Sequence, residues 1–152
     1  FALSLTYPVI EADSEEAKNI ISVVEKKLLN AYGLKTLAKG EENYVEVYEG
    51  DGKKRDSSYH QGITWPWLLG LYYNALKNIL KKTKKKDAKK ELETKLEKFI
   101  EKTSKTFQKE ISHNGCIGSI SELYDSRKPY LPKGTIAQAW SVAEVFRIIL
   151  NK

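Results

Sequence analysis

The sequence has 152 residues, of which 41% are hydrophobic, so the chain is long enough and apolar enough for the core of one domain. A single cysteine, Cys116, excludes an internal disulfide framework and a zinc site with paired cysteines, and it favours a cytoplasmic, reducing setting. No run approaches the ~18 apolar residues of a membrane span, and the first ten residues lack the basic start of a signal peptide. We therefore expect neither a membrane partner nor a secretory leader.

The net charge of +6 is concentrated in one part of the chain. Residues 77–110 contain 13 Lys and 6 acidic residues, a net charge of +7, whereas the remainder is nearly neutral. The centre is KKTKKKDAKK, Lys81 to Lys90, in which neither an aromatic residue nor Arg alternates with the lysines. This pattern favours a solvated tip between two helices, so no nucleic-acid partner is expected. A polyanion-binding module that acts through this segment stays open as an alternative.

The first predicted helix covers residues 14–32. Its N-cap is Asp13, and Glu16 completes a capping box. Apolar residues then recur at helical spacing, which indicates one buried face. Gly33 is the expected left-handed residue at the C-terminal end.

Three further helices are predicted along the chain. The second covers residues 65–82, with Thr64 as its N-cap, and it is apolar around more than half of its surface, which indicates a largely buried helix. The third covers residues 87–111 and has a narrow apolar stripe between Lys and Glu, which places it on the outside. The fourth covers residues 136–150 and is again of the buried type.

The two long connections between these helices are the expected location of the chemistry. Short strand pairings around residues 44–48 and 117–123 stay open, but no strand pattern is as strong as the helical ones, so the predicted class is all-α. Consecutive helices in such an array run antiparallel. The two long connections therefore lie at one end, and the lysine-rich tip lies at the other. Connections of this length inside a domain usually carry function.

Both long connections are rich in carboxylates, amides and aromatic rings. Sugar rings stack their C–H faces on Trp and Tyr, and their hydroxyl groups need dense hydrogen bonding, so this mixture suits a carbohydrate. Glycoside hydrolysis needs two carboxyl groups that flank the scissile bond. Composition and spacing alone equally allow a structural role, with the tryptophans in the core and Glu122 as a loop carboxylate.

Four long strings follow one another along nearly the whole chain: FALSL, LLNAYGLKTL, RDSSYHQGITWPWLLG and GSISELYDSRKPYLPKGTIAQAWSVAEVFRII. In this order they resemble successive blocks of the C-terminal catalytic region of glycogen debranching enzymes, the amylo-alpha-1,6-glucosidase family. The resemblance implies an (α/α)6 toroid with buried inner helices and amphipathic outer helices. We therefore expect a partial (α/α)6 toroid, a helix-hairpin array with its functional loops at one end.

The resemblance also implies a reaction and a catalytic residue. It implies inverting hydrolysis of the α-1,6-linked glucose stub of a branched α-glucan such as glycogen, with an Asp as general acid and a Glu as general base. We expect no cofactor, and no metal because the only two histidines, His60 and His113, lack ligand spacing. The glutamate in SISELYD matches the family's base, which assigns that role to Glu122. Eight further residues are expected to bind the substrate: Tyr59, His60, Gln61, Trp65, Tyr124, Asp125, Gln138 and Trp140.

No residue of the chain matches the family's general acid, which lies upstream of the FALSL block. We therefore expect residues 1–152 to form a single domain that is the C-terminal fragment of a catalytic domain, with an incomplete ring. Such a chain is expected to be inactive by itself, and its exposed apolar flanks are candidates for self-association. Two alternatives stay open: a non-catalytic glycogen-binding module, and another (α/α)6 glycosidase acting on a different α-glucoside.

Overall fold

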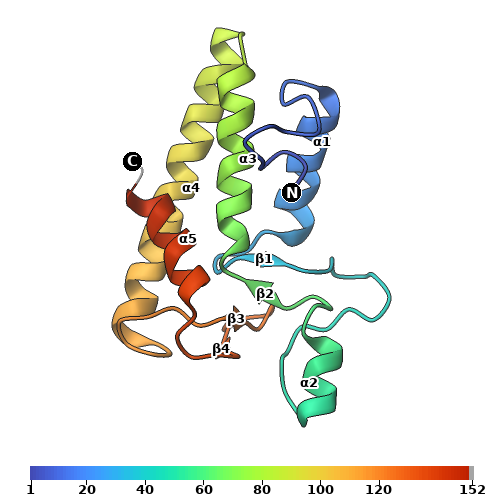
Figure 1. Cartoon of the computed structure of the whole chain (residues 1–152), viewed down its shortest axis with the longest axis vertical. Helices are drawn as coiled ribbons and strands as arrows, with labels where there is room; N and C mark the ends of the chain where they lie inside the picture. Colours follow the sequence, from blue (N-terminus) through green and yellow to red (C-terminus); the bar gives the residue numbers. More distant parts are fainter. Residues whose placement is uncertain (151–152) are drawn as a thin grey trace.

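The computed structural model describes residues 1–150, which contain five α-helices, one π-helical segment and four short strands (Figure 1). In chain order the elements are α1 (Glu15–Val23), η1 (Val24–Leu28, the π-helical segment), β1 (Leu34–Lys35), α2 (Gly52–Ser58), β2 (Thr64–Trp65), α3 (Leu68–Lys82), α4 (Lys86–His113), β3 (Leu123–Tyr124), β4 (Pro132–Lys133) and α5 (Ala139–Leu150). No helix among these residues is long and apolar enough to span a membrane.

The strands form one antiparallel sheet in the order β1-β2-β3-β4. Leu34 pairs with Trp65, and Thr64 pairs with Tyr124. Strands β1 and β2 belong to the connection before α3, and strands β3 and β4 belong to the connection before α5. The two long connections therefore meet at one end of the helices, opposite the tip between α3 and α4 (Figure 1), which confirms that part of the sequence-based prediction.

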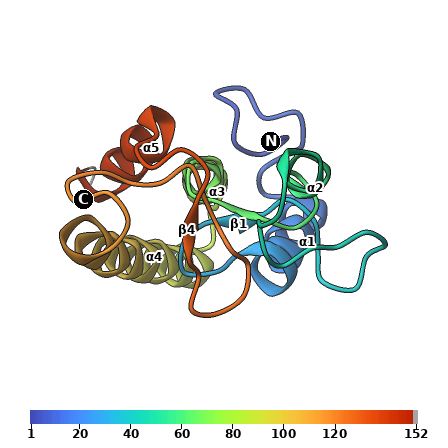
Figure 2. The same ribbon diagram turned by 90° about the horizontal axis from the view of Figure 1, so that it is seen from below.

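The predicted all-α class is wrong, and with it the expected partial (α/α)6 toroid. The structure combines helices with a four-stranded antiparallel sheet. The physical reason is that both long connections enter the interior, where Thr64 and Tyr124 are fully buried. Backbone N–H and C=O groups buried in this way need partners, and pairing between the strands supplies them. Seen from the sheet end, the strands lie below α3 and between α1 and α4 (Figure 2).

The first helix is shorter than the predicted range 14–32. It changes to π-helical geometry in η1 and ends at Leu28, because the chain then turns back to form an isolated bridge between Leu29 and Leu34. Gly33 does not adopt the predicted left-handed conformation. It is required for close approach instead, since a Cβ atom at this position would lie 2.3 Å from the backbone oxygen of Trp65.

Two predicted N-caps are also wrong. Ser14, not Asp13, caps α1, because its Oγ accepts a hydrogen bond from the backbone N–H of Ala17 at 3.1 Å. The helix predicted for residues 65–82 begins at Leu68, since Thr64 and the next residue are part of β2. Helix α4 confirms the predicted range 87–111 to within two residues at each end. The last helix starts at Ala139 instead of residue 136. Helix α2 was not predicted.

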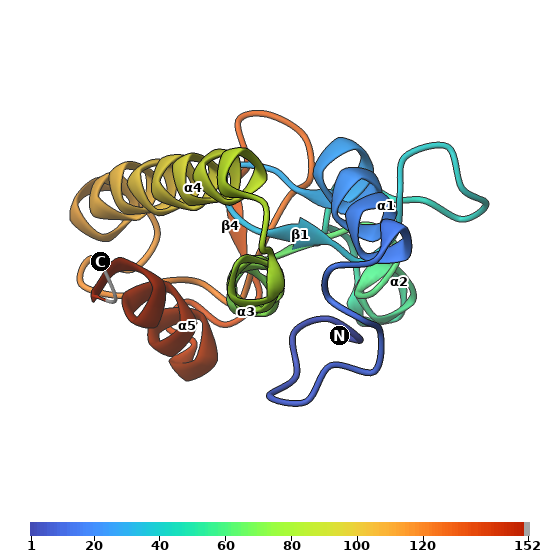
Figure 3. The same cartoon turned by 90° about the horizontal axis from the view of Figure 1, so that it is seen from above.

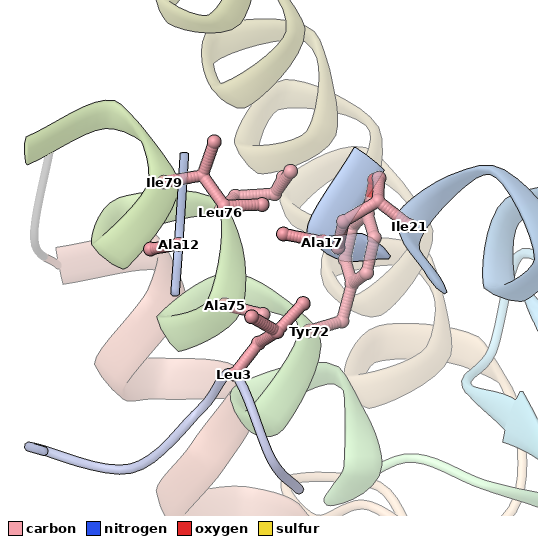
Figure 4. Packing of buried hydrophobic residues seen from close by; sticks show 8 residues of the cluster. All are labelled: Leu3, Ala12, Ala17, Ile21, Tyr72, Ala75, Leu76 and Ile79. Carbon is pink, nitrogen blue, oxygen red and sulfur yellow. The ribbon is translucent and has the colours of Figure 1, made fainter. Parts of the chain in front are cut away.

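Helix α3 is the central element of the core (Figure 3). On one side it packs against α1, and Figure 4 shows Tyr72 and Leu76 of α3 directed toward Ala17 and Ile21 of α1. On the other side it contacts α4 and α5 around Phe107. A third, smaller cluster lies at the sheet and consists of Ile63, Trp65 and Leu123. The sheet is therefore attached directly to the end of the helical core.

A hydrogen-bonded link at Thr64 should contribute measurably to stability. The Thr64 hydroxyl accepts a hydrogen bond from Asn30 Nδ2 at 2.7 Å and lies 2.7 Å from Ser126 Oγ. The variant Thr64→Val removes this hydroxyl from its two partly buried partners, so the free energy of unfolding should fall by about 1–3 kcal/mol. Urea denaturation checks this value.

The matched control is Thr83→Val, because the Thr83 hydroxyl bonds only the Ile79 carbonyl of its own helix, at 2.8 Å. This variant should change the free energy of unfolding by less than about 0.5 kcal/mol. Equal losses in the two variants would show that the Thr64 link does not hold the sheet to the chain around it.

Candidate active site

A pocket of about 750 Å³ lies between the sheet and the adjacent ends of the helices. Its apolar lining comes from residues 1–3, α1, η1, β1 and α3. The other part of its lining, which we call the wall, combines rings, an amide and a carboxylate, contributed by Tyr59, His60, Trp65, Trp67, Glu122, Gln138 and Trp140. We call this cavity the aromatic pocket. Six of the residues predicted for the site lie in this wall, so the structure brings together segments that are far apart in the sequence.

The Glu122 side chain is held by hydrogen bonds to both carboxylate oxygens. Oε1 accepts a hydrogen bond from the Tyr59 hydroxyl and a longer one from Gln138 Nε2 at 3.4 Å. Oε2 accepts a hydrogen bond from the backbone N–H of Thr135 at 3.0 Å. The residue is only 9% exposed. A carboxylate that is fixed in this way at the wall of a pocket is suited to accept a proton from a bound water.

The local backbone explains how Glu122 reaches this position. The backbone N–H of Glu122 donates a hydrogen bond to the carbonyl of Thr135 at 2.9 Å. The segment before β3 therefore lies beside the segment after β4. Gly134 has a φ of +68° and lies directly against the carboxylate, since a Cβ atom there would be 2.4 Å from Glu122 Oε2. Glycine is therefore required at this position both for its backbone conformation and for the space that it leaves.

The rings of the wall pack against one another. The His60 ring is stacked on Trp65, with 5.2 Å between the centroids, and Tyr59 meets the same indole edge-on at 4.7 Å. Trp67 and Trp140 form a second stacked pair at 5.2 Å. Trp65 is only 3% exposed, whereas Trp140 is 46% exposed. The accessible ring surface of the wall is therefore provided mainly by His60 and Trp140.

Tyr59 is a protonated hydrogen-bond donor in this arrangement. Burial raises the pKa of its hydroxyl, and the hydrogen bond to Glu122 and the negative charge of that carboxylate raise the pKa further. The residue follows the last turn of α2 as its C-cap. The backbone carbonyl of Tyr59 accepts a hydrogen bond from Trp65 Nε1 at 3.3 Å, which fixes the turn between α2 and β2.

A second, polar pocket of about 710 Å³ lies on the other side of the Tyr59–Glu122 pair. Besides these two residues, its lining consists of Tyr48, Arg55, Asp56, Lys133, Gly134 and Thr135. We call it the polar pocket. The hydrogen-bonded pair thus forms part of the wall of both cavities, and the Glu122 carboxylate has cationic side chains on the polar side.

Tyr124 was predicted to bind the substrate, but it does not line either pocket. It is fully buried, and its hydroxyl donates to Glu110 Oε1 at 2.9 Å. Burial is the main reason why the pKa of Tyr124 is raised, followed by the charge of Glu110. The ring stacks on Tyr32 with 4.6 Å between the centroids. The structure therefore places Tyr124 in the core that supports β3.

Asp125 and Gln61 also lie outside the aromatic pocket. Asp125 is buried and accepts a hydrogen bond from the backbone N–H of Tyr48 at 2.9 Å. The backbone carbonyl of Gln61 accepts a hydrogen bond from the N–H of Val45 at 2.6 Å. Both residues therefore tie the first long connection into place.

The sequence-based reasoning missed several residues of the site. Gly134 and Thr135 contact Glu122 through their backbone, and the sequence does not show that these backbone groups meet the carboxylate. Lys35 in β1 lines the aromatic pocket, and burial is the main cause of the lowered pKa of its ammonium group. Trp67 also belongs to the wall, although it was not among the predicted site residues. In residues 1–150 no group of three or more His, Cys, Asp or Glu side chains is arranged to hold a metal ion.

A fixed carboxylate among stacked rings and amides is typical of proteins that act on carbohydrates. The sequence profile of the amylo-alpha-1,6-glucosidase family matches residues 1–147. The chain therefore belongs to the amylo-alpha-1,6-glucosidase family, as the four strings predicted, and is related to the glycosidase region of glycogen debranching enzymes. A comparison with curated proteins gives no significant match.

The contact between Gly134 and Glu122 leads to a prediction. In Gly134→Ala the new methyl group would overlap Glu122 Oε2, so the carboxylate should move away from the backbone N–H of Thr135. The matched control is Gly118→Ala, since Gly118 also has a positive φ of +85° but has nothing within 4 Å of a Cβ atom.

In both variants alanine must adopt a positive φ, which costs roughly 1–2 kcal/mol, but only Gly134→Ala should also displace the carboxylate. Crystal structures of the two variants, together with their urea midpoints, test this expectation. A Glu122 side chain that keeps its hydrogen bond to Thr135 in Gly134→Ala would contradict it.

Proposed function

We propose that this chain supplies the general base of an amylo-alpha-1,6-glucosidase. The enzyme would remove the single α-1,6-linked glucose of a branch stub from a branched α-glucan such as glycogen or its limit dextrin. The observation that supports this most directly is the position of Glu122, whose carboxylate is held by Tyr59 and Thr135 in the wall of the aromatic pocket. Membership of the family supplies the reaction class.

In the proposed reaction Glu122 takes a proton from a water molecule. The resulting hydroxide attacks the anomeric carbon on the face opposite the leaving oxygen, while a general acid gives its proton to that oxygen and the C–O bond breaks. The configuration of the released glucose is therefore inverted. Acid and base stand roughly 6.5–9.5 Å apart in inverting enzymes, which leaves room for the water.

The general acid is proposed to come from outside residues 1–152. Among the described residues that line the aromatic pocket, Glu122 is the only carboxylate. Asp56 shares the polar pocket with Glu122, but it lines only that cavity. The chain by itself would then bind glucan without hydrolysing it.

The wall of the aromatic pocket is suited to hold the glucose unit. The exposed ring surface of Trp140 and His60 offers flat faces for the sugar C–H groups. Gln138 Nε2 and the ring nitrogens of His60 offer polar groups for its hydroxyls. Trp65 lies behind His60 and supports it by stacking.

A non-catalytic glycogen-binding module is the second candidate. Hydrolysis needs two carboxyl groups, whereas the described lining of the aromatic pocket contains one, and this observation favours a binding module. The two candidates differ in one respect: binding alone does not require a base, so changing Glu122 would leave the function of a binding module intact.

The variant Glu122→Gln in the full-length protein tests the proposal. The amide keeps the shape of the side chain but cannot take the proton of the water, so glucose release from a branched limit dextrin should fall about 10²-fold or more. Binding of the dextrin should be nearly unchanged. Proton NMR of the first product from the unmodified protein should show β-glucose, the configuration expected for inversion.

The matched control is Asp56→Asn, which removes the other carboxylate of the polar pocket. We expect it to release glucose at close to the normal rate. If Asp56→Asn loses activity and Glu122→Gln keeps it, the base is misassigned. If neither variant loses activity while both bind dextrin, the binding-module candidate is favoured instead.

A further inference from the structure

We propose that Tyr59 is a positioning residue for Glu122, and that its hydroxyl keeps the carboxylate turned toward the aromatic pocket. The inference rests on the proposed function of Glu122. It assigns Tyr59 a different role from the stacking surface for sugar that its residue type suggests. The hydrogen bond joins the end of α2 to the segment before β3, across 63 residues of sequence.

The ring of Tyr59 is already surrounded by other rings of the protein. Its centroid lies 4.7 Å from that of His60, 4.7 Å from that of Trp65 and 5.7 Å from that of Tyr48. These contacts hold the phenol in place and leave its hydroxyl end as the functional part. A sugar that stacked on this ring would have to displace one of these neighbours.

The polar pocket provides the reason why Glu122 needs to be held. Arg55 and Lys133 line that pocket together with Glu122, and both are cations. A carboxylate that is free to rotate is attracted to such partners, whereas Asp56 in the same pocket repels it. Lys133 also lies 4.0 Å from the Asp125 carboxylate, so Arg55 is the less engaged of the two cations in ion pairing. The other charged and titratable groups near the pair are Lys35, His60 and Tyr48. The Tyr59 hydroxyl counteracts this attraction because its hydrogen bond holds Glu122 Oε1 toward the aromatic pocket.

The donor pattern leaves Glu122 able to act as a base. Three donors, the Tyr59 hydroxyl, the Thr135 N–H and the Gln138 amide, contact its two oxygens. An ionised carboxylate has about four lone-pair sites, so one remains for the proton of a water. Because the pKa of the Tyr59 hydroxyl is raised, this group is protonated at neutral pH and remains a hydrogen-bond donor.

The variant Tyr59→Phe in the full-length protein tests the inference, since it removes the hydroxyl and keeps the ring. We expect kcat for glucose release from limit dextrin to fall about tenfold while KM stays unchanged, because positioning of the base affects the chemical step and not sugar binding. A crystal structure of the variant should show the Glu122 carboxylate turned toward Arg55 or Lys133.

A double-mutant cycle separates this role from a merely structural one. In the Glu122→Gln background the base is already lost, so adding Tyr59→Phe should cause no further decrease in kcat. The control is Tyr48→Phe, which removes a hydroxyl from the neighbouring ring that has no hydrogen bond to Glu122. It should lower kcat by less than about twofold.

Three outcomes would overturn the inference. A rise in KM with unchanged kcat in Tyr59→Phe would make Tyr59 a sugar-binding residue. If Tyr59→Phe lowered kcat by the same factor in the unmodified protein and in the Glu122→Gln variant, the role of Tyr59 would be structural. Full activity of Glu122→Gln would refute the proposed function itself, and the inference would then fail with it.

Discussion

The pairing of Thr64 with Tyr124 joins the two long connections at the centre of the sheet, and the geometry of the site depends on it. Trp65 follows Thr64 directly in β2, and Glu122 immediately precedes β3. The pair is anchored on both sides, because the Thr64 hydroxyl bonds Asn30 and the Tyr124 hydroxyl bonds Glu110. A slip of one residue in this register would turn the neighbouring side chains to the opposite face of the sheet. The pocket wall and the carboxylate are thus positioned by the same few backbone contacts.

The helices were predictable where their apolar period is long. Helix α4 runs for 28 residues and α3 for 15, so their stripes are unmistakable. Two-residue strands have no period to detect, and their existence depends on partners that are distant in the sequence. Trp65 illustrates the consequence: it precedes a strong helical pattern and was therefore assigned to a helix, although pairing with Leu34 makes it part of a strand. The helices could be read from local patterns, but the sheet could not.

The candidate site was predictable as a set of residues but not as a geometry. Glu122, Tyr124 and Asp125 of the string SELYD were all expected to contribute to the site, but of these three only Glu122 lines the aromatic pocket. Successive residues of strand β3 point to opposite faces of the sheet. Leu123 packs with Trp65 at the sheet, whereas Tyr124 packs with Phe107 against the helices. The backbone N–H of Thr135, which holds Glu122, has no signature in the sequence because every residue except proline carries the same group.

The lysine-rich tip between α3 and α4 lies at the end of the molecule opposite the sheet (Figure 1). Helix α3 has 15 residues and separates the two ends by about 22 Å. At physiological ionic strength the Debye length is about 8 Å, so the potential of the lysines is largely screened before it reaches the aromatic pocket. The two ends of the molecule are therefore electrostatically independent. The charge of the tip can vary during evolution, or be altered by lysine acetylation, without changing how the pocket binds a neutral ligand.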